Sequence, residues 1–463
     1  MLRIFRHFVP ASIVFLAFVE ISLICFAWHF YLLDKPFSIS QTYDVLQSPS
    51  LHLALLTGAV MVLSGLYHTK VFSDYRVMAI QIAVTFVFLC PIALAWGFYQ
   101  TNDGAAGSLW AIDRRALFSW LLCILLTRTV FLMFADLNVF KRHVLVLGTG
   151  RKAARIAALA AEPSVRHFVP VAYLRCGDEP GIVPAEVDVD EGDPGAITRF
   201  ARQHRATEIV VATDDRRGLP VSQLLQCRVA GIHVIDYLDF IERETETVDL
   251  NALQPGWLIF SDGFQRSLLR RVCKRSFDIV SSLALLLFTL PLLLLAALLI
   301  VIESPGPVLY RQQRVGLGGR PFVLLKLRSM RADAEKDGAP RWAQAGDPRV
   351  TRVGRFIRRA RIDELPQLWN VLLGDMSFVG PRPERPAFVD DFCQQIPFYA
   401  ERHCVKPGIT GWAQTNYPYG ASLQDARNKL SYDLYYAKNH GLFLDLIILL
   451  QTIRVILWAD GSR

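Results

Sequence analysis

The run IVSSLALLLFTLPLLLLAALLIVI, residues 279–302, is long and apolar enough to cross a bilayer as a single helix. Basic residues flank it on both sides: Arg270, Arg271, Lys274 and Arg275 before it, and Arg311, Arg314 and Arg320 after it. A single crossing would leave one of these clusters outside the cell, although Lys and Arg near membrane helices prefer the cytoplasmic side. The flanks therefore favour a segment whose two ends lie on the same side of the membrane.

Pro291 lies near the middle of this run. A proline inside a helix removes one hydrogen bond and clashes with the preceding turn. We therefore predict a re-entrant hairpin over about 279–302, which enters the membrane, breaks at Pro291 and returns to the face it came from. The break leaves carbonyl groups that need a donor inside the membrane, and the hydroxyl of Thr289 is a candidate.

The segment SPGPVLYRQQRVGLGGRPFVLLKLRSM, residues 304–330, is rich in turns and basic side chains. Lys326 and Arg328 alternate with leucines, so strand geometry would place both cations on one face. A solvated face and a phosphate-binding site explain this pattern equally well. Residues 331–350 are polar and contain glycine and proline, which predicts a loop.

Asp363 and Glu364 are adjacent within RRARIDELPQLWNVL, residues 358–372, which begins with Arg358. One interpretation is structural: Asp363 caps a helix that starts at Glu364 and carries Pro366 in its first turn. The other is catalytic, because a carboxylate beside cations and a helix N-terminus stays ionised and can attack a phosphate. Such a carboxylate can carry a phosphoryl group as an acyl phosphate, which divides one transfer into two steps.

Two further turns carry cations suited to phosphate. Residues 380–383 read GPRP and present Arg382, whose guanidinium can contact a phosphate with two nitrogens. Residues 405–414, VKPGITGWAQ, form a second Gly/Pro loop that offers Lys406. Beside an apolar hairpin, these turns and the Asp-Glu pair indicate phosphosugar or phospholipid chemistry at a membrane interface.

The N-terminal part contains apolar runs that predict four transmembrane helices, over residues 11–32, 51–68, 78–98 and 115–135. No small-residue cleavage site follows the first run, so we expect a retained anchor and not a cleaved signal peptide. Basic residues precede the first run and follow the fourth, and an even number of crossings places both groups in the cytoplasm. Arg114 and Arg115 lie on the opposite side in this topology. Arg128, inside the fourth run, favours a contact between helices or snorkelling over a functional role.

Residues 141–245 have the pattern of a soluble α/β domain. HVLVLGTGRKAARIAALAA, residues 143–161, reads as a strand, a glycine turn and a helix, and further strand patterns predict a Rossmann-like parallel sheet. Gly148 and Gly150 belong to a GxGxxA turn, a weak signal for a nucleotide pyrophosphate. A dinucleotide site also needs an acidic residue at the end of the second strand, where Arg175 stands. A scaffold or regulatory role is therefore favoured over nucleotide binding.

Composition limits the class of protein. The 463 residues are 52% hydrophobic and 20% charged, which indicates membrane segments, and the net charge of +8 suits anionic lipids and phosphate-bearing substrates. Nucleic acid is not expected as a partner, because the basic residues flank apolar runs and form no solvated stripe. The eight cysteines include no CxxC pair, so neither a zinc site nor a disulfide framework is indicated.

Residues 271–463 resemble the bacterial sugar transferases that move a hexose 1-phosphate onto polyprenyl phosphate, the monotopic phosphoglycosyl transferases. The matching stretches are KRSFDIV, the proline-broken run, KLRSM, RIDELPQLWNVLLGDMSFVGPRP and VKPGITGWAQTN. The whole chain resembles the large form of that family, with four N-terminal spans, a Rossmann-like domain and then the transferase. It is similar to the undecaprenyl-phosphate glucose or galactose phosphotransferases of exopolysaccharide and O-antigen synthesis.

The resemblance implies a role for each matched residue. Asp363 would attack the sugar-bearing phosphate of a UDP-sugar, release UMP and hold the phosphosugar, and polyprenyl phosphate would then accept it. Glu364 would assist as the second member of the dyad, Arg358 and Arg382 would hold phosphate oxygens, and Pro291 would mark the helix break. A magnesium ion near Asp363 would bridge the diphosphate. Some relatives have serine directly before that proline, where this chain has Leu290.

The expected architecture is a membrane α-helical N-terminal bundle (1–140), an α/β Rossmann-like domain (141–245), a connector (246–270) and a mixed α+β transferase domain (271–463). The terminal run 441–458 is expected to be an interfacial or packing helix, with a fifth membrane span as the less favoured alternative. The resemblance further implies that the protein is a homodimer in the bacterial inner membrane and that its catalytic domain lies in the cytoplasm. Two other classes stay open: a membrane-bound, NAD-dependent nucleotide-sugar oxidoreductase and a non-catalytic scaffold for polysaccharide export.

Overall fold

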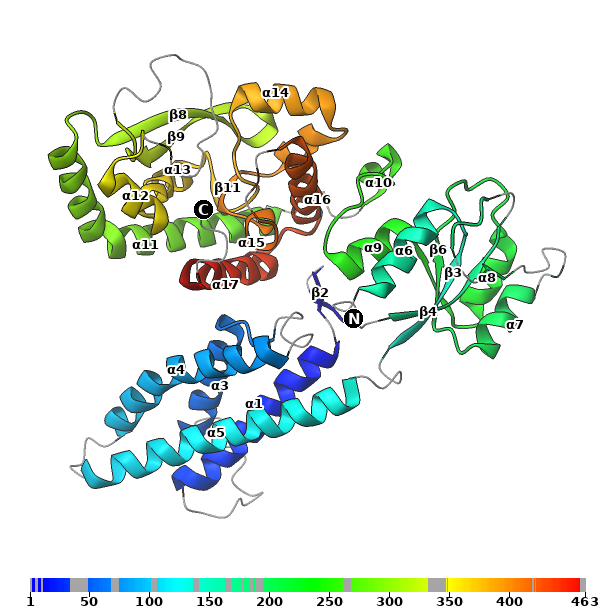
Figure 1. Ribbon diagram of the computed structural model, residues 1–463, viewed down its shortest axis with the longest axis horizontal. Helices are drawn as coiled ribbons and strands as arrows, with labels where there is room; N and C mark the ends of the chain where they lie inside the picture. The colour runs from blue at the N-terminus through cyan, green and yellow to red at the C-terminus, as the bar shows by residue number, and fades with distance from the viewer. Residues whose placement is uncertain are drawn as a thin grey trace. The chain divides into compact units, whose positions relative to one another are not determined.

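The computed structural model describes residues 2–4, 7–9, 11–33, 49–67, 75–100, 106–135, 141–162, 168–176, 179–183, 186–187, 193, 195–261, 268–331, 347, 349–418, 420 and 422–458. These residues form two compact units. The first comprises Met1–Ile4 and Phe8–Glu244, and the second comprises Phe5–His7 and Thr245–Arg463. Each unit is described by itself, and Figure 1 shows their elements.

The described N-terminal part consists of a short strand pair, β1 (Leu2–Ile4) and β2 (His7–Val9), followed by long helices. The helices are α1 (Ala11–Leu33), α3 (Pro49–Leu63), α4 (Tyr75–Gln100) and α5 (Ala106–Ala135). Each overlaps one of the four predicted spans. Their apolar side chains point both into the helix bundle and outward. Trp120 and Ile124 are buried between the helices, whereas Phe18 and Met133 are exposed. Apolar residues all round a helix suit a lipid environment.

Arg128 makes a contact between helices, as one of the favoured interpretations held. Its Nε lies 2.8 Å from Oε1 of Glu20 on α1, and both side chains are almost completely buried. Its Nη1 also donates to the carbonyl oxygen of Leu66 at 3.1 Å. This buried charge pair therefore links α1 to α5. The side chains of Arg114 and Arg115 lie outside the described residues.

The α/β domain is built on a five-stranded sheet of order β5-β4-β3-β6-β7, all parallel. The strands are β3 (Arg142–Leu147), β4 (Phe168–Leu174), β5 (Glu186–Val187), β6 (Glu208–Val211) and β7 (His233–Asp236). Its helices are α6 (Arg151–Ala161), α7 (Ala196–Gln203), α8 (Val221–Val229) and α9 (Tyr237–Thr245). Figure 1 shows α6 and α9 on one side of the sheet and α7 and α8 on the other. The predicted parallel sheet is confirmed.

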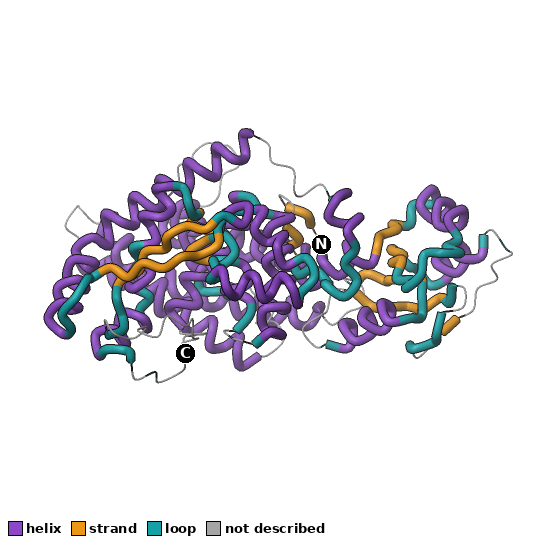
Figure 2. The backbone as a smooth tube through the Cα atoms, turned by 90° about the horizontal axis from the view of Figure 1, so that it is seen from above, coloured by secondary structure: helices purple, strands orange, loops and turns teal. Residues whose placement is uncertain are grey.

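The second unit mixes helices with two small sheets. Strands β8 (Leu309–Val315) and β9 (Pro321–Leu327) form an antiparallel ribbon around the turn η5 (Leu317–Gly319), prominent in Figure 2. Strand β10 (Ser377–Val379) pairs in parallel with β11 (Gly408–Thr410). The helical elements are α10 (Pro255–Phe260), α11 (Leu268–Glu303), α12 (Arg352–Arg359), η6 (Ile362–Glu364), α13 (Gln367–Leu373), α14 (Pro386–Gln395), η7 (Tyr399–Cys404), α15 (Trp412–Asn416), α16 (Leu423–Asn439) and α17 (Leu442–Trp458).

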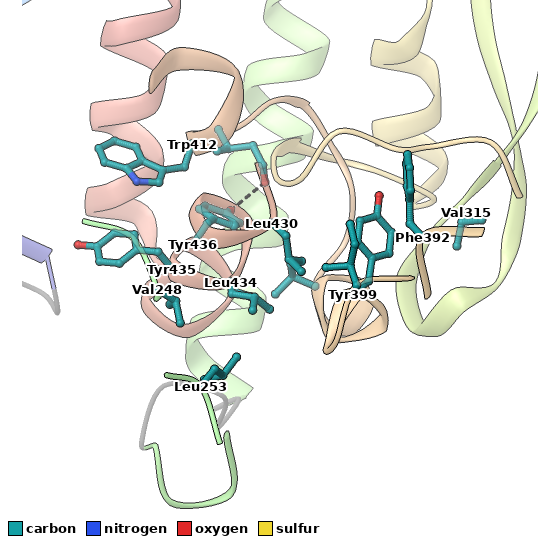
Figure 3. Close-up of a cluster of buried hydrophobic side chains, with 14 of the residues drawn as sticks. Val248, Leu253, Val315, Phe392, Tyr399, Trp412, Leu430, Leu434, Tyr435 and Tyr436 are labelled. Atoms are coloured by element: carbon teal, nitrogen blue, oxygen red, sulfur yellow. Dashed lines mark hydrogen bonds between the residues drawn. The ribbon is translucent and has the colours of Figure 1, made fainter. Parts of the chain in front are cut away.

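The core of this unit gathers around α16, whose Leu430, Leu434, Tyr435 and Tyr436 are fully buried. Figure 3 shows these side chains among aromatic neighbours from α14, η7 and α15. Val248 and Leu253 from the predicted connector belong to the same core. Part of the connector therefore folds with the transferase region.

Helix α11 contains the predicted hairpin but is one continuous helix with Pro291 inside it. Figure 1 shows a marked bend along α11. Thr289 Oγ1 donates to the carbonyl oxygen of Leu285 at 2.7 Å, whereas the carbonyl that Pro291 deprives of its helical donor belongs to Leu287. Thr289 thus does not make the bond proposed for it. Among the described residues, α11 is the one helix with the length and apolar composition to cross a membrane, and 17% of its most apolar segment is buried.

Both ends of α11 are fixed to the same unit. Near its start, Asp278 accepts hydrogen bonds at 3.0 Å from the hydroxyl of Ser377 and the amide of Phe378. At its end, Glu303 accepts from the amides of Arg352 and Val353 at 2.7 and 2.9 Å. The stretch from Asp278 to Glu303 would span about 38 Å as a straight helix, and Figure 1 shows α11 bent along its length.

Candidate active site

The Asp-Glu pair lies in a tight turn between α12 and α13. Arg361, at the end of α12, adopts a left-handed conformation with φ 56°, and the short helix η6 (Ile362–Glu364) follows. Helix α13 begins only at Gln367, after Pro366, and no side chain caps its first turn. Asp363 is therefore not the cap of this helix, and the purely structural interpretation of Asp363 was wrong.

Three cations surround the carboxylate of Glu364. Lys326 Nζ, from β9, and Arg382 Nη2 lie 3.1 and 3.2 Å from its Oε1. Arg361 Nη1 lies 3.5 Å from Oε2. Burial opposes ionisation of Glu364, but these three positive charges outweigh it and hold its pKa far below the ordinary value. Glu364 is therefore a fixed negative charge at neutral pH.

Asp363 is in the opposite situation. Its side chain is 7% exposed, and in the described part of the chain no hydrogen bond or ion pair takes up its carboxylate. Burial and the negative charge of Glu364 raise the pKa of Asp363 to about 6, against the positive charges of Lys326 and Arg358. An ionised carboxylate with a raised pKa is more basic and more nucleophilic.

The other predicted cations divide between this site and elsewhere. Arg358, half-buried at the end of α12, lowers the pKa of Asp363 by its charge. Arg328 lies away from the dyad, where its guanidinium donates to the carbonyl oxygens of Pro305, at 2.9 Å, and Ser304, just after the end of α11. The structure thus separates Lys326 from Arg328, which the alternating pattern had placed together.

Lys406 also lies in another neighbourhood. Burial lowers its pKa, and the charges that act on it are those of Arg275, Asp278, Asp375 and Lys274. It approaches Gly374, where a Cβ atom would lie 3.6 Å from its Nζ. Lys406 is therefore grouped with the start of α11 and the end of α13.

Sequence reasoning did not single out two arginines that support the site. Arg314 Nη1 donates to the carbonyl of Pro383 at 3.0 Å, and Arg402 Nη2 donates to the carbonyl of Arg382 at 3.0 Å. Arg314 appeared only as a flank of the apolar run, and no local pattern marks Arg402. Their contacts depend on chain segments far apart in the sequence.

The glycine turn of the α/β domain is occupied by the protein's own carboxylates. Asp214 accepts from the amides of Arg151 and Lys152 at 2.9 and 3.2 Å, at the start of α6. Glu179 accepts from the amide of Thr149 at 3.1 Å. A Cβ atom on Gly150 would lie 2.6 Å from Asp214 Oδ2, so the bare backbone serves the approach of this carboxylate. These amides are the donors that a pyrophosphate would use.

Gly148 is required for a different reason. It has φ +122°, which other residues rarely adopt, and an added Cβ would lie 2.7 Å from the carbonyl oxygen of Ala212. The turn is therefore a close-packed feature at the carboxyl end of β3 whether or not a ligand binds there.

A magnesium ion at the dyad would need oxygen ligands. In the described ranges, no group of three or more His, Cys, Asp or Glu side chains is arranged to hold a metal ion. Magnesium commonly takes one or two carboxylates and completes its shell with substrate phosphates and water. Asp363, with its carboxylate unbonded, fits that kind of site, whereas Glu364 is already paired with cations.

Comparison with known proteins supplies the family. Residues 269–459 match the family model described as bacterial sugar transferase. The chain is 43% identical over 275 residues to a UDP-N-acetylgalactosamine-undecaprenyl-phosphate N-acetylgalactosaminephosphotransferase of Aeromonas hydrophila, covering 59% of this chain and 63% of that protein. It is 48% identical over 193 residues to a UDP-glucose:undecaprenyl-phosphate glucose-1-phosphate transferase of Caulobacter vibrioides, covering 41% and 71%.

A third relative is shorter. The exopolysaccharide production protein PSS of Rhizobium leguminosarum is 42% identical over 187 residues, covering 39% of this chain and 94% of that protein. The matched part of this chain thus accounts for almost all of one relative and for just under two thirds of the Aeromonas protein. On the Caulobacter and Rhizobium matches, which span most of each relative, the chain belongs to the family of bacterial sugar transferases.

Proposed function

We propose that this protein transfers a hexose 1-phosphate from a UDP-sugar to undecaprenyl phosphate, releases UMP, and so begins the synthesis of an exopolysaccharide or O-antigen repeat unit. The observation that carries the proposal is the difference between the surroundings of the two carboxylates in the dyad. Glu364 is held by three cations, while the adjacent Asp363 keeps an unbonded carboxylate with a raised pKa. The names of the Aeromonas and Caulobacter relatives, which mention undecaprenyl phosphate and a sugar phosphate, support the substrate class.

The proposed reaction has two steps. In the first, an oxygen of Asp363 bonds to the sugar-bearing phosphorus, and the bond from that phosphorus to the bridging oxygen breaks. UMP leaves with the electron pair, and the sugar phosphate remains on Asp363 as an acyl phosphate. In the second, a phosphate oxygen of undecaprenyl phosphate attacks the same phosphorus and displaces the carboxylate. The enzyme returns to its starting state.

The cations would offset the charge that gathers on the phosphates during attack. Arg382 is 34% exposed and can turn part of its guanidinium to a phosphate oxygen while it contacts Glu364. Arg358 lies on the other side of Asp363 in the sequence and supplies a second positive charge. Asp363 would also hold a magnesium ion, which would neutralise charge on the diphosphate when bound.

We further propose that α11 is a re-entrant membrane helix. Its exposed side chains are apolar over most of its length, with Phe288 84% exposed, and both of its ends are bonded to the same domain. This arrangement would place the dyad at the cytoplasmic face of the bacterial inner membrane, where undecaprenyl phosphate presents its headgroup. The homodimer implied by the family resemblance is part of the same proposal.

The test is UMP release from a panel of UDP-sugars in the presence of undecaprenyl phosphate and magnesium. We expect release with one sugar or a small group of sugars, and its loss in Asp363→Asn. Asp391→Asn is the matched control, because Asp391 is exposed on α14 and bonds Gln395. Equal release from wild type and Asp363→Asn would remove Asp363 as the nucleophile, and no release with any sugar would remove the proposed reaction.

A further inference from the structure

The second unit contains an arginine that is almost completely buried. Arg402, on η7, is 5% exposed, and its Nη2 lies 2.7 Å from Oδ2 of Asp433, which is equally buried on α16. Its Nη1 donates to the hydroxyl of Tyr399 at 2.9 Å, and its guanidinium lies 5.2 Å from the centre of that ring. A buried ion pair is weak support for stability, because desolvation cancels most of the attraction. Stability alone therefore does not account for this group.

The remaining contact of this guanidinium indicates that role. Arg402 Nη2 also donates to the backbone carbonyl of Arg382 at 3.0 Å. The next carbonyl, of Pro383, accepts from Arg314 Nη1 at 3.0 Å. Two successive carbonyls of the GPRP turn are thus held by arginines, while the side chain of Arg382 extends to Glu364 Oε1 at 3.2 Å.

The start of the turn is fixed as well. The amide of Gly380 donates to Thr410 at 2.8 Å, and the amide of Gly408 donates to Pro381 at 3.0 Å. The strand pair β10–β11 therefore anchors residues 380 and 381, but it does not reach residue 382. Beyond the turn, the amide of Val315 donates to the carbonyl oxygen of Glu384 at 3.0 Å, and Arg402 holds the carbonyl of Arg382 between these two anchors.

We propose that Arg402 is a positioning residue for Arg382: by holding the backbone carbonyl of Arg382, it sets the guanidinium of that residue against Glu364 and the donor diphosphate. The proposal rests on the proposed function, in which Arg382 contacts phosphate. Asp433 and Tyr399 take part by fixing the plane of the Arg402 guanidinium. A planar fork bonded to three partners holds a carbonyl more rigidly than a single ammonium can.

A double-mutant cycle tests this coupling. Arg402→Lys keeps the positive charge beside Asp433 but cannot reach all three partners. In an otherwise wild-type chain, we expect it to slow single-turnover UMP release about 10- to 100-fold, since small misplacements of a substrate contact cost that much. In an Arg382→Met background, the same change should alter the rate by no more than about 2-fold, because the group it positions is gone.

Two further variants separate positioning from stability. Ser422→Ala removes the side-chain cap of α16, the helix that carries Asp433, without touching Arg402. It should lower the melting temperature and change UMP release by the same small factor in both backgrounds. If Arg402→Lys fails to fold, the paired variant Arg402→Met/Asp433→Leu leaves no buried charge unpaired and takes its place in the cycle.

The cycle is also run on the dissociation constant for UDP, which does not depend on turnover. The proposal would be overturned if Arg402→Lys changed both UMP release and the dissociation constant for UDP by the same factor with and without Arg382. That result would leave the proposed reaction intact. A wild-type protein that binds UDP but releases no UMP would overturn the proposed function, and the binding cycle would still decide the role of Arg402. A wild-type protein that does not bind UDP would overturn both.

Discussion

The glycine turn of the α/β domain and the dyad of the transferase unit both bring carboxylates together with groups that attract anions. In the turn, Asp214 and Glu179 use their oxygens on backbone amides at the start of α6. In the dyad, the carboxylate oxygens of Glu364 form ion pairs with cations, whereas within the described residues those of Asp363 form no ion pair or hydrogen bond. The first site is already satisfied by the protein itself, and the second has one carboxylate left for chemistry.

This difference shows how the same side chain becomes structural or reactive. A carboxylate that accepts several hydrogen bonds is stabilised in its ionised form and loses nucleophilic character. A carboxylate that is buried beside another negative charge has a raised pKa and keeps that character. The presence of acidic residues near a glycine turn or an arginine cluster therefore does not identify a site. Whether acidic residues form a reactive site depends on the partners that their carboxylates already have.

The largest effect should come from the unbonded carboxylate. Asp363→Asn should lower UMP release by more than about 1,000-fold, because an amide cannot form the acyl phosphate. Glu364→Gln should lower it less, since that residue assists and does not bond to phosphorus. Labelled sugar phosphate trapped on the protein after denaturation checks the same point, and it should be found on Glu364→Gln and not on Asp363→Asn. Label on the Asp363 variant would reverse the two roles.

The second prediction uses two cations on either side of Leu327, the last residue of β9: Lys326 and Arg328. Lys326→Met removes a charge from the dyad and should slow turnover about 10- to 100-fold, with a small change in the melting temperature. Arg328→Met removes donors from the carbonyls of Ser304 and Pro305 and should lower stability by about 1 to 3 kcal/mol. Turnover per folded molecule should then stay within about 3-fold of wild type. The opposite pattern would place Arg328 in the site and Lys326 outside it.

The third prediction concerns the closed turn. Asp214→Ala should expose the amides of Arg151 and Lys152 and destabilise α6 by about 1 to 2 kcal/mol. Gly150→Ala should be destabilising alone but milder in the Asp214→Ala background, since the contact at 2.6 Å is then absent. Hydrogen exchange of α6 amides in the full chain measures both changes. Additive effects would mean that Asp214 is not the group that requires glycine at position 150.

The same turn allows a direct comparison with nucleotide binding. NAD or ADP should not bind the wild-type chain, because the pyrophosphate donors are taken. Binding by the wild type would contradict the closed-turn interpretation and revive the oxidoreductase class considered from the sequence. Binding that requires Asp214→Ala together with Glu179→Ala would confirm that these carboxylates occupy the anion position.

The sequence predicted the parts of the site that depend on neighbours in the chain. The Asp-Glu pair, the arginines before it and the GPRP turn are local patterns, and Arg358 and Arg382 do lie near the dyad. The sequence could not place Lys326, which is 38 residues from Glu364 and reaches it only because β9 packs beside η6. For the same reason, it could not separate Lys326 from Arg328 or move Lys406 to the start of α11.

The fold shows a similar limit. The parallel sheet and four N-terminal helices follow from period and length, which are properties of single segments. The alternative in which Asp363 caps a helix is excluded because Arg361 takes a left-handed conformation and α13 begins only at Gln367. The glycine turn was only a weak signal for an external anion, and only the folded chain brings Asp214, 63 residues away, to the amide of Arg151.

The smallest predicted effect is a loss of stability of the α/β domain in acid, caused by protonation of a carboxylate that is paired with arginines. Glu208 lies 2.7 Å from Arg243 and 3.1 Å from Arg142, and these charges lower its pKa although burial opposes ionisation. A carboxyl whose pKa is lower in the folded state stabilises the fold above its ordinary pKa of 4.5 and loses that contribution as the pH falls through the lower value. The α/β domain should therefore open more readily in acid, as hydrogen exchange of β6 would show.

Glu208→Gln is the control, because it removes the titration and should flatten the pH dependence of β6 opening in that range. Its effect on UMP release should be negligible at neutral pH, in contrast to every change at Asp363. If the pH dependence were as steep in Glu208→Gln as in the wild type, the charge of Glu208 would not be what the domain depends on. The contrast between paired carboxylates such as Glu208 and the reactive Asp363 would then come from their positions in the fold and not from their partners.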